Sequence, residues 1–270
     1  MSAEPMPTST DASTPSAPAW GPAAGAARLV RALQGPLERL GSGFMVSPEA
    51  AALRDSLGLH GWEVYAGGRF GVLGDVEADV VTAAAVFFPA ERIRTLWKAA
   101  RAAGAPHELA VHYAGAAHDW ARRRLAGFAG AERLAALLEP LVTQAPEAGA
   151  PLFAGWRALP LPDDAPARAV QLLHVLREHR GAMHAVAVLA SGLSPLQAIL
   201  AGPEGEEGAR YFRWPAPFPV VDADVRAAHR WAEERTDLLE APVWAQLGDE
   251  ADECAALLRA ADAHARSTAD

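Results

Sequence analysis

Apolar residues recur every three or four positions along most of the chain, which is the spacing of one helix face. In residues 22–40, for example, Val30, Leu33, Leu37 and Leu40 follow this spacing. No long stretch alternates apolar and polar residues, as a half-buried strand does. The pattern therefore predicts an all-α protein.

Cap and stop residues divide this pattern into separate helices. Ser47 followed by Pro48 is typical of a helix start, and Gly58 is placed to end that helix. A proline- and aromatic-rich stretch, residues 202–219, is expected to be irregular. Further helices are predicted over residues 22–40, 75–87, 89–103, 106–128, 130–144, 167–179, 220–235 and 249–265, with a short one from Ser194.

Residues 60–74 interrupt the helical pattern. Glycine occupies five of these positions, and glycine in a helix interior is destabilising. Trp62 and Phe70 supply apolar anchors between the glycines. The segment is predicted to be a structured Gly-rich loop or a small hairpin.

A second Pro- and Gly-rich stretch, residues 146–166, is the best candidate for a boundary within the chain. It predicts two packed helical halves, an N-terminal half over residues 22–150 and a C-terminal half over residues 151–270. Residues 1–21 are rich in Ser, Thr, Pro and Ala, without the basic start and apolar centre of a signal peptide. We expect them to form a disordered tail.

Composition narrows the class of protein. Hydrophobic residues make up 51% of the chain, as in a globular protein, and no apolar run is long enough to cross a membrane. The single cysteine, Cys254, excludes an internal disulfide and is consistent with the cytoplasm. A net charge of −9 argues against a general nucleic-acid binder, because phosphate neutralisation needs a basic surface.

The most unusual polar segment is residues 174–184, where three of the nine histidines lie between apolar runs. On a continuous helix, His174 and Glu178 would share a face, whereas His174 and His179 would diverge. A helix break at Gly181 would let both sides of the segment point inward. We then expect His179, Arg180 and His184 to face one interior cavity as catalytic residues, with His174 and Glu178 as ligand-binding residues.

Three interpretations of this cluster stay open. Two imidazoles and a carboxylate could hold a transition metal, or they could act as a general acid and base with Arg180 stabilising an anion. Alternatively, Arg177, Glu178 and His179 pair with one another at a helix end, where cations are favoured. The sequence of this cluster does not identify a particular metal or cofactor, and the spacing of a strong zinc motif is absent.

The Gly-rich segment adds a second group of candidates. Arg69 could hold a carboxylate or phosphate of a ligand, with Tyr65 and His60 nearby. In the alternative, the glycines serve tight turns and Arg69 pairs with a helix end. The segment does not follow a strand, so it is not a dinucleotide or phosphate-loop signature.

Four short segments carry a resemblance to known proteins: Arg69–Gly74, Val80–Ala83, Leu176–Gly181 with His184, and Thr236–Pro242. Together, and in this order, they resemble an actinobacterial family of helical proteins commonly labelled helix-turn-helix. The resemblance implies a winged-helix segment between Leu200 and Arg226. Only about two dozen proline-rich residues lie there, and a recognition helix with a wing needs more residues and fewer prolines. The C-terminal half is therefore expected to be degenerate and winged-helix-like.

These observations favour a small-molecule-binding helical protein with a His, Arg and Glu pocket, which includes an enzyme of specialised bacterial metabolism. One alternative is a ligand-responsive transcriptional regulator derived from a winged-helix family, and another is a His-ligated metal protein. The expected partner is a small-molecule ligand, with no specific duplex DNA and no membrane. Association into a homo-oligomer is left open.

Overall fold

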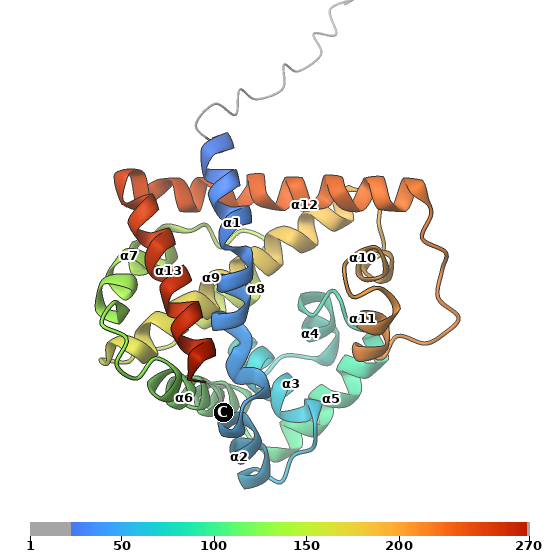
Figure 1. The fold of residues 1–270 in the computed structure, drawn as a ribbon. Helices are drawn as coiled ribbons and strands as arrows, with labels where there is room; N and C mark the ends of the chain where they lie inside the picture. The colour runs from blue at the N-terminus through green and yellow to red at the C-terminus, as the bar shows by residue number, and fades with distance from the viewer. Residues whose placement is uncertain (1–22, 269–270) are drawn as a thin grey trace, which may run out of the picture.

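The computed structural model describes residues 23–268, which form helices without a strand, so the prediction of an all-α fold is confirmed (Figure 1). The expected tail lies outside the described residues. The elements are α1 (Ala23–Ser42), η1 (Gly43–Val46), α2 (Pro48–Ser56), α3 (Trp62–Phe70), η2 (Gly71–Leu73), α4 (Ala78–Ala84), α5 (Ala90–Ala103), α6 (Pro106–Arg124), α7 (Ala131–Gln144), α8 (Pro151–Arg157), α9 (Ala165–Ala190), α10 (Pro195–Ala201), α11 (Gly205–Tyr211), α12 (Ala223–Trp244), η3 (Ala245–Glu250) and α13 (Ala251–Ser267).

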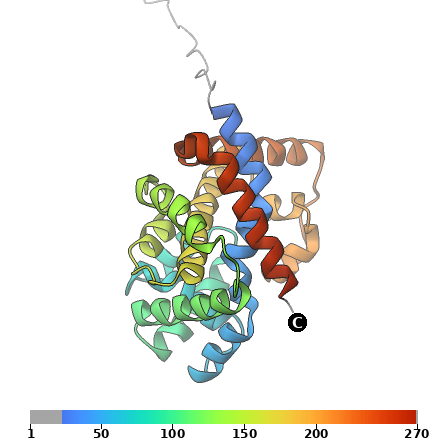
Figure 2. The ribbon, with the colours of Figure 1, turned by 60° about the vertical axis from the view of Figure 1, so that its left-hand side comes forward.

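Helix α9 lies at the centre of the molecule, and α1, α6, α7, α8 and α12 all pack against it. Helix α1 crosses α9 and α12 and also packs on α13, while α12 runs along one edge of the fold (Figures 1 and 2). Helices α3, α4 and α5 pack together beside this assembly, and α10 and α11 form a small pair next to α12. Packing therefore crosses the boundary expected near residue 150.

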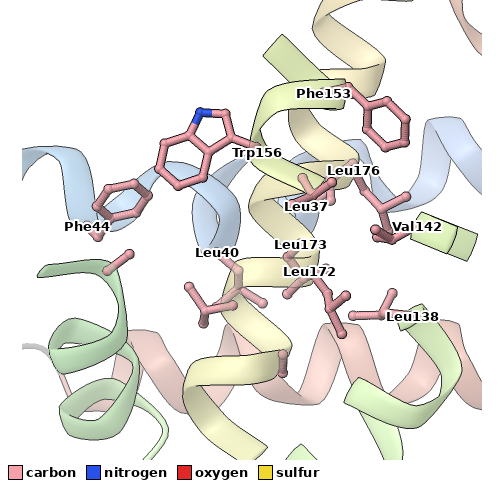
Figure 3. Close-up of a cluster of buried hydrophobic side chains, with 14 of the residues drawn as sticks. Leu37, Leu40, Phe44, Leu138, Val142, Phe153, Trp156, Leu172, Leu173 and Leu176 are labelled. Atoms are coloured by element: carbon pink, nitrogen blue, oxygen red, sulfur yellow. The ribbon is translucent and has the colours of Figure 1, made fainter. Parts of the chain in front are cut away.

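The core around α9 is built from large apolar side chains of both parts of the chain. All residues from 169 to 176 are buried, which is more than two helical turns, so α9 is enclosed on every side there. A helix buried all round has no single apolar stripe, and its polar side chains must find partners inside the protein. The cluster in Figure 3 includes Leu37, Leu40, Phe44, Leu138, Val142, Phe153, Trp156, Leu172, Leu173 and Leu176.

The prediction of a loop or hairpin over residues 60–74 is wrong. The segment contains α3 and the 3-10 turn η2. Its glycines allow close packing against α6: a Cβ on Gly68 would lie 2.2 Å from Cγ of Tyr113, and one on Gly71 would lie 2.1 Å from the carbonyl oxygen of Pro106. The gain from this close approach outweighs the low helix propensity of glycine.

The expected helix break at Gly181 is also absent, because α9 runs without interruption from Ala165 to Ala190. A single glycine costs a helix roughly 1 kcal/mol, which the packing of so long a buried helix easily offsets. The expected boundary and the segment expected to be irregular hold short helices as well. These are α8 within residues 146–166 and α11 within residues 202–219.

Several local predictions are confirmed. The Ser47 side chain accepts a hydrogen bond from the Ala50 amide and caps α2, and Ser194 forms a capping box with Gln197 at the start of α10. Cys254 is buried in α13, where burial raises the pKa of its thiol to about 11. Within residues 23–268, no single helix has the length and apolar composition needed to cross a membrane, although α9 and α10 reach it as a pair bent by 102°.

The close approach of α3 and α6 yields the first prediction. Gly68→Ala should destabilise the protein by about 1–3 kcal/mol, because the added Cβ overlaps the ring of Tyr113. Gly115→Ala, in the interior of α6 with no atom within 4 Å of the added Cβ, should instead stabilise it by about 0.5–1 kcal/mol. Urea unfolding of both variants measures this difference. Equal effects of the two substitutions would contradict the packing of α3 on α6.

Candidate functional site

A cavity of about 950 Å³ lies between α9 and a wall formed by α3, α10, α11 and the chain after α4, with α1 and α12 at its ends. Helix α9 presents Arg177, Glu178, Arg180, Gly181 and His184 to it. These positions recur with helical spacing, so one face of a continuous α9 supplies all of them. The absence of a break at Gly181 therefore does not remove the site.

The opposite wall is aromatic. Trp62 contacts Tyr65, Phe88 and Tyr211 edge to face, with ring centroids 5.1, 5.8 and 4.9 Å apart. Phe212 extends this wall through its contact with Phe88, and Phe87 also lines the cavity. Edge-to-face aromatic clusters of this kind offer a large apolar surface with well-defined ring orientations.

On α9, Arg180 is the charged side chain with the fewest partners. Its Nη1 donates a hydrogen bond to Asp237 at 3.2 Å, and its Nη2 lies 3.9 Å from Glu233, which is too far for a hydrogen bond. Asp237 is shared, since it also accepts from Arg31 at 2.7 Å. The Arg180 side chain is only 11% exposed. Arg180 lines the cavity, and most of its donors have no hydrogen-bond partner among the described residues.

His184 lies one turn after Arg180, and its ring stacks on Phe87 with centroids 5.3 Å apart. Its Nδ1 is 3.2 Å from Oγ1 of Thr236, and that hydroxyl donates its own proton to the Ala232 carbonyl at 2.8 Å. The hydroxyl oxygen must then accept, so Nδ1 carries the proton and Nε2 is the basic nitrogen. Burial lowers the pKa of His184, with Glu233 opposing, so the ring is neutral at pH 7.

Glu233 stands between two histidines of the cavity. Its Oε1 is 3.6 Å from Nδ1 of His184 and 3.7 Å from Nε2 of His229. Neither Glu233 nor His229 was predicted from the sequence. Their spacing of four residues on one predicted helix was the available signal, but nothing in the chain showed that this helix packs on α9.

The second charged group on α9 is centred on Glu178, and its charges are paired within the protein. Arg69 donates to both carboxylate oxygens of Glu178 at 2.8 Å and to the Tyr65 hydroxyl at 2.6 Å. Arg177 donates to Glu178 at 3.1 Å and to Glu38 at 2.9 Å. Burial raises the pKa of Glu178, but the neighbouring cations, Arg69 first, outweigh it and lower the pKa to about 2. The two arginines and two glutamates of this network balance in charge, and Arg69 fixes the position of the Tyr65 hydroxyl at the cavity.

The remaining predicted site residues lie away from the cavity. His174 is buried behind its wall, where Nδ1 donates to the Gly41 carbonyl at 2.8 Å. His179 is buried against Phe153 and pairs with Glu240 of α12. His60 is exposed in a separate shallow depression. The expectation that His179 shares the cavity with Arg180 and His184 is therefore not met, because adjacent helix positions point about 100° apart.

The structure also bears on the metal interpretation. Convergence of His179 and His184 required a break at Gly181, and α9 is continuous there. In the part of the chain that the structure describes, no three His, Cys, Asp or Glu side chains are arranged to hold a metal ion. The cavity thus offers hydrogen-bonding and acid–base groups on α9 and α12.

A family model described as a helix-turn-helix family matches residues 30–218, which is most of the chain. The chain belongs to this helix-turn-helix family. The match includes α9 and the aromatic wall and ends before α12, which supplies Glu233, Thr236 and Asp237. No curated protein and no solved structure matches the chain.

Within the matched region, α10 and α11 are two short helices that pack together and are joined by three residues. Both helices line the cavity, through Ile199 and Tyr211 among others. The first turn of α11 carries Glu206 and Glu207. In this chain, the helix pair therefore forms one side of the cavity and presents acidic residues at the start of its second helix.

The closed network yields a second prediction. Glu178→Gln leaves the Arg69 guanidinium without its buried counter-ion, which should destabilise the protein by about 3–5 kcal/mol in urea unfolding. Glu147→Gln is the matched control, since it removes the partner of Arg157 at the surface. We expect its unfolding midpoint to stay close to that of the wild type. A small effect of Glu178→Gln would show that the Arg69 charge is solvated.

The burial of His174 yields a third prediction, on pH. Burial, its largest influence, lowers the pKa of His174 from 6.5 to about 4. Between these values, the unfolded chain binds a proton that the folded chain does not, so stability falls as the pH drops from about 6.5 to about 4, by roughly 3 kcal/mol in total.

His174→Asn keeps a donor for the Gly41 carbonyl but does not titrate there. Urea unfolding at a series of pH values should show a shallower dependence in this variant. Parallel curves for the variant and the wild type would contradict the assignment to His174.

Proposed function

We propose that the cavity binds a small organic acid with an aromatic or similarly flat apolar body. The observation that carries this proposal is the unfilled donor set of Arg180 facing the aromatic wall across a cavity of about 950 Å³. Ligand pockets in proteins commonly have this size and combine an apolar lining with a few convergent polar groups.

The distribution of charge among the arginines around the cavity favours an acidic ligand. Arg69 and Arg177 are neutralised by Glu178 and Glu38, whereas Arg180 shares Asp237 with Arg31. A guanidinium has five donors and binds a carboxylate through two of them at once. A carboxylate on Arg180 would therefore use donors that make no hydrogen bond in the fold, and the hydrogen bond to Asp237 could stay in place beside it.

A ligand-responsive regulator is the second candidate, and membership of the helix-turn-helix family favours it. Against direct reading of duplex DNA stand the net charge of −9 and the glutamates that open α11. Only residues 212–222 separate α11 from α12, which supports a shortened wing as part of the same proposal. In this proposal, α10 and α11 retain a role as a wall of the ligand cavity.

The fourth prediction tests the binding of an acid. Isothermal titration with phenylacetate and phenylpyruvate should show binding, and Arg180→Ala should weaken it by about 10- to 100-fold, which is the value of a hydrogen bond to a charged group. Arg122→Ala, at the exposed end of α6, is the control and should bind as the wild type does.

Two outcomes would contradict the proposal. One is the absence of binding by the wild type at millimolar acid, and the other is equal binding by Arg180→Ala and the wild type. Specific binding of one duplex DNA sequence by nanomolar protein at physiological salt would instead support the second candidate, a DNA-binding regulator.

A further inference from the structure

We propose, on the basis of the ligand binding proposed above, that His184 is a catalytic base and that the cavity interconverts the keto and enol forms of aryl-substituted 2-oxo acids. Three features of the described residues carry this inference. They are the fixed tautomer of His184, its position one turn from Arg180, and the aromatic wall opposite.

The hydrogen-bond chain from His184 through Thr236 to the Ala232 carbonyl leaves the lone pair on Nε2. Nε2 has no hydrogen-bond partner among the described residues, and it is not one of the sealed polar atoms of the interior. Stacking on Phe87 restricts rotation of the ring. The base is therefore held in one orientation with its reactive nitrogen open to the cavity, as general base catalysis requires.

Arg180 and His184 lie four residues apart on α9, which separates them by about 6 Å along the helix axis. A 2-oxo acid whose carboxylate is bound to Arg180 would place its C3 methylene within reach of a group one turn further along. An aryl substituent on C3 then meets Phe87, Phe88 and Trp62. The arrangement thus fits an acid whose removable proton lies between its polar head and its aromatic body.

The reaction needs no oxidant and no second substrate. The C3–H bond breaks, its proton forms a bond to Nε2, and its electron pair becomes the C2–C3 double bond. The carbonyl oxygen takes the negative charge, which the open donors of Arg180 stabilise. The imidazolium then returns the proton to that oxygen and leaves the enol, and the reverse sequence regenerates the keto form.

The neighbours of His184 are suited to a ring that gains and loses a proton. Arg180 and His229 disfavour the imidazolium, and Glu233 and Asp237 favour it. Burial dominates in the resting site and keeps Nε2 unprotonated. When the ring takes a proton, Glu233 at 3.6 Å from Nδ1 stabilises the positive charge through its electrostatic attraction.

The experiment follows exchange of the C3 protons of phenylpyruvate in D₂O by proton NMR, with binding of the same acid measured by titration. We expect the wild type to accelerate exchange above an equal concentration of imidazole. His184→Gln should lower the protein-dependent rate by at least about 100-fold, since a positioned base contributes 10²–10⁴. Its affinity should stay within about threefold of the wild type, because Arg180 holds the acid.

Thr236 is a positioning residue with a test of its own. Thr236→Val removes the acceptor that fixes the tautomer and should slow exchange without weakening binding, and Thr236→Ser should restore the rate. A purely structural role would not distinguish valine from serine in this way. His107→Gln, at an exposed position of α6, is the control and should leave both rate and affinity unchanged.

The outcomes separate this proposal from the one on which it rests. If phenylpyruvate binds but its exchange is not accelerated, or if His184→Gln exchanges as fast as the wild type, the catalytic proposal is overturned and ligand binding stands. If phenylpyruvate does not bind to the wild type but phenylacetate does, the catalytic proposal alone is overturned, and if neither acid binds, both proposals are overturned.

Discussion

Helix α9 is enclosed by α1, α6, α7, α8 and α12, so the polar side chains on its buried length cannot reach water and need partners inside the protein. The other helices meet this requirement in part, since Nε2 of His174 and Nε2 of His179 keep no hydrogen-bond partner among the described residues. Helix α3 contributes Arg69 to Glu178, the end of α1 contributes the Gly41 carbonyl to His174, and α12 contributes Glu240 to His179. Three elements that are distant in the sequence are therefore each tied to one helix by a polar contact as well as by apolar packing.

The same requirement divides the polar groups of α9 into two sets with different consequences. The network around Glu178 has two arginines for one buried carboxylate and a second, exposed carboxylate beyond, so it is complete without a ligand. The set around Arg180 has hydrogen bonds of 3.2 Å and contacts of 3.6 to 3.9 Å, and its side chains border open space. An unfilled donor on a side chain that is mostly buried interacts more strongly with a ligand than a fully exposed one does. Open space beside side chains with unfilled donors, rather than the number of ionisable groups, makes the second set the candidate site.

The sequence predicts much of this fold and a few of the side chains that line the cavity, among them Arg180 and His184. Helical spacing and the caps at Ser47 and Ser194 depend on neighbouring residues, so they can be recognised locally. The pairing of His174 with Glu178 on one face followed in the same way. The helix at residues 62–70 could not be predicted, because its glycines are explained only by the approach of α6. Glu233 and Thr236 were missed because they gain their significance from packing of α12 on α9, which no local pattern contains.

The contacts between α9 and α12 also fix how these two helices align. His179 meets Glu240, Arg180 meets Asp237, and His184 meets Thr236 and then Glu233, so later positions on α9 pair with earlier positions on α12. Sliding α12 by one turn would separate every pair and leave several charges buried without partners, at a cost of several kcal/mol each. Apolar side chains alone would tolerate such a slide far better, since their contacts are not directional. The polar residues of the α9–α12 contact thus determine the position of Thr236 and Glu233 relative to His184, and with it the tautomer and charge environment of the base that faces the cavity.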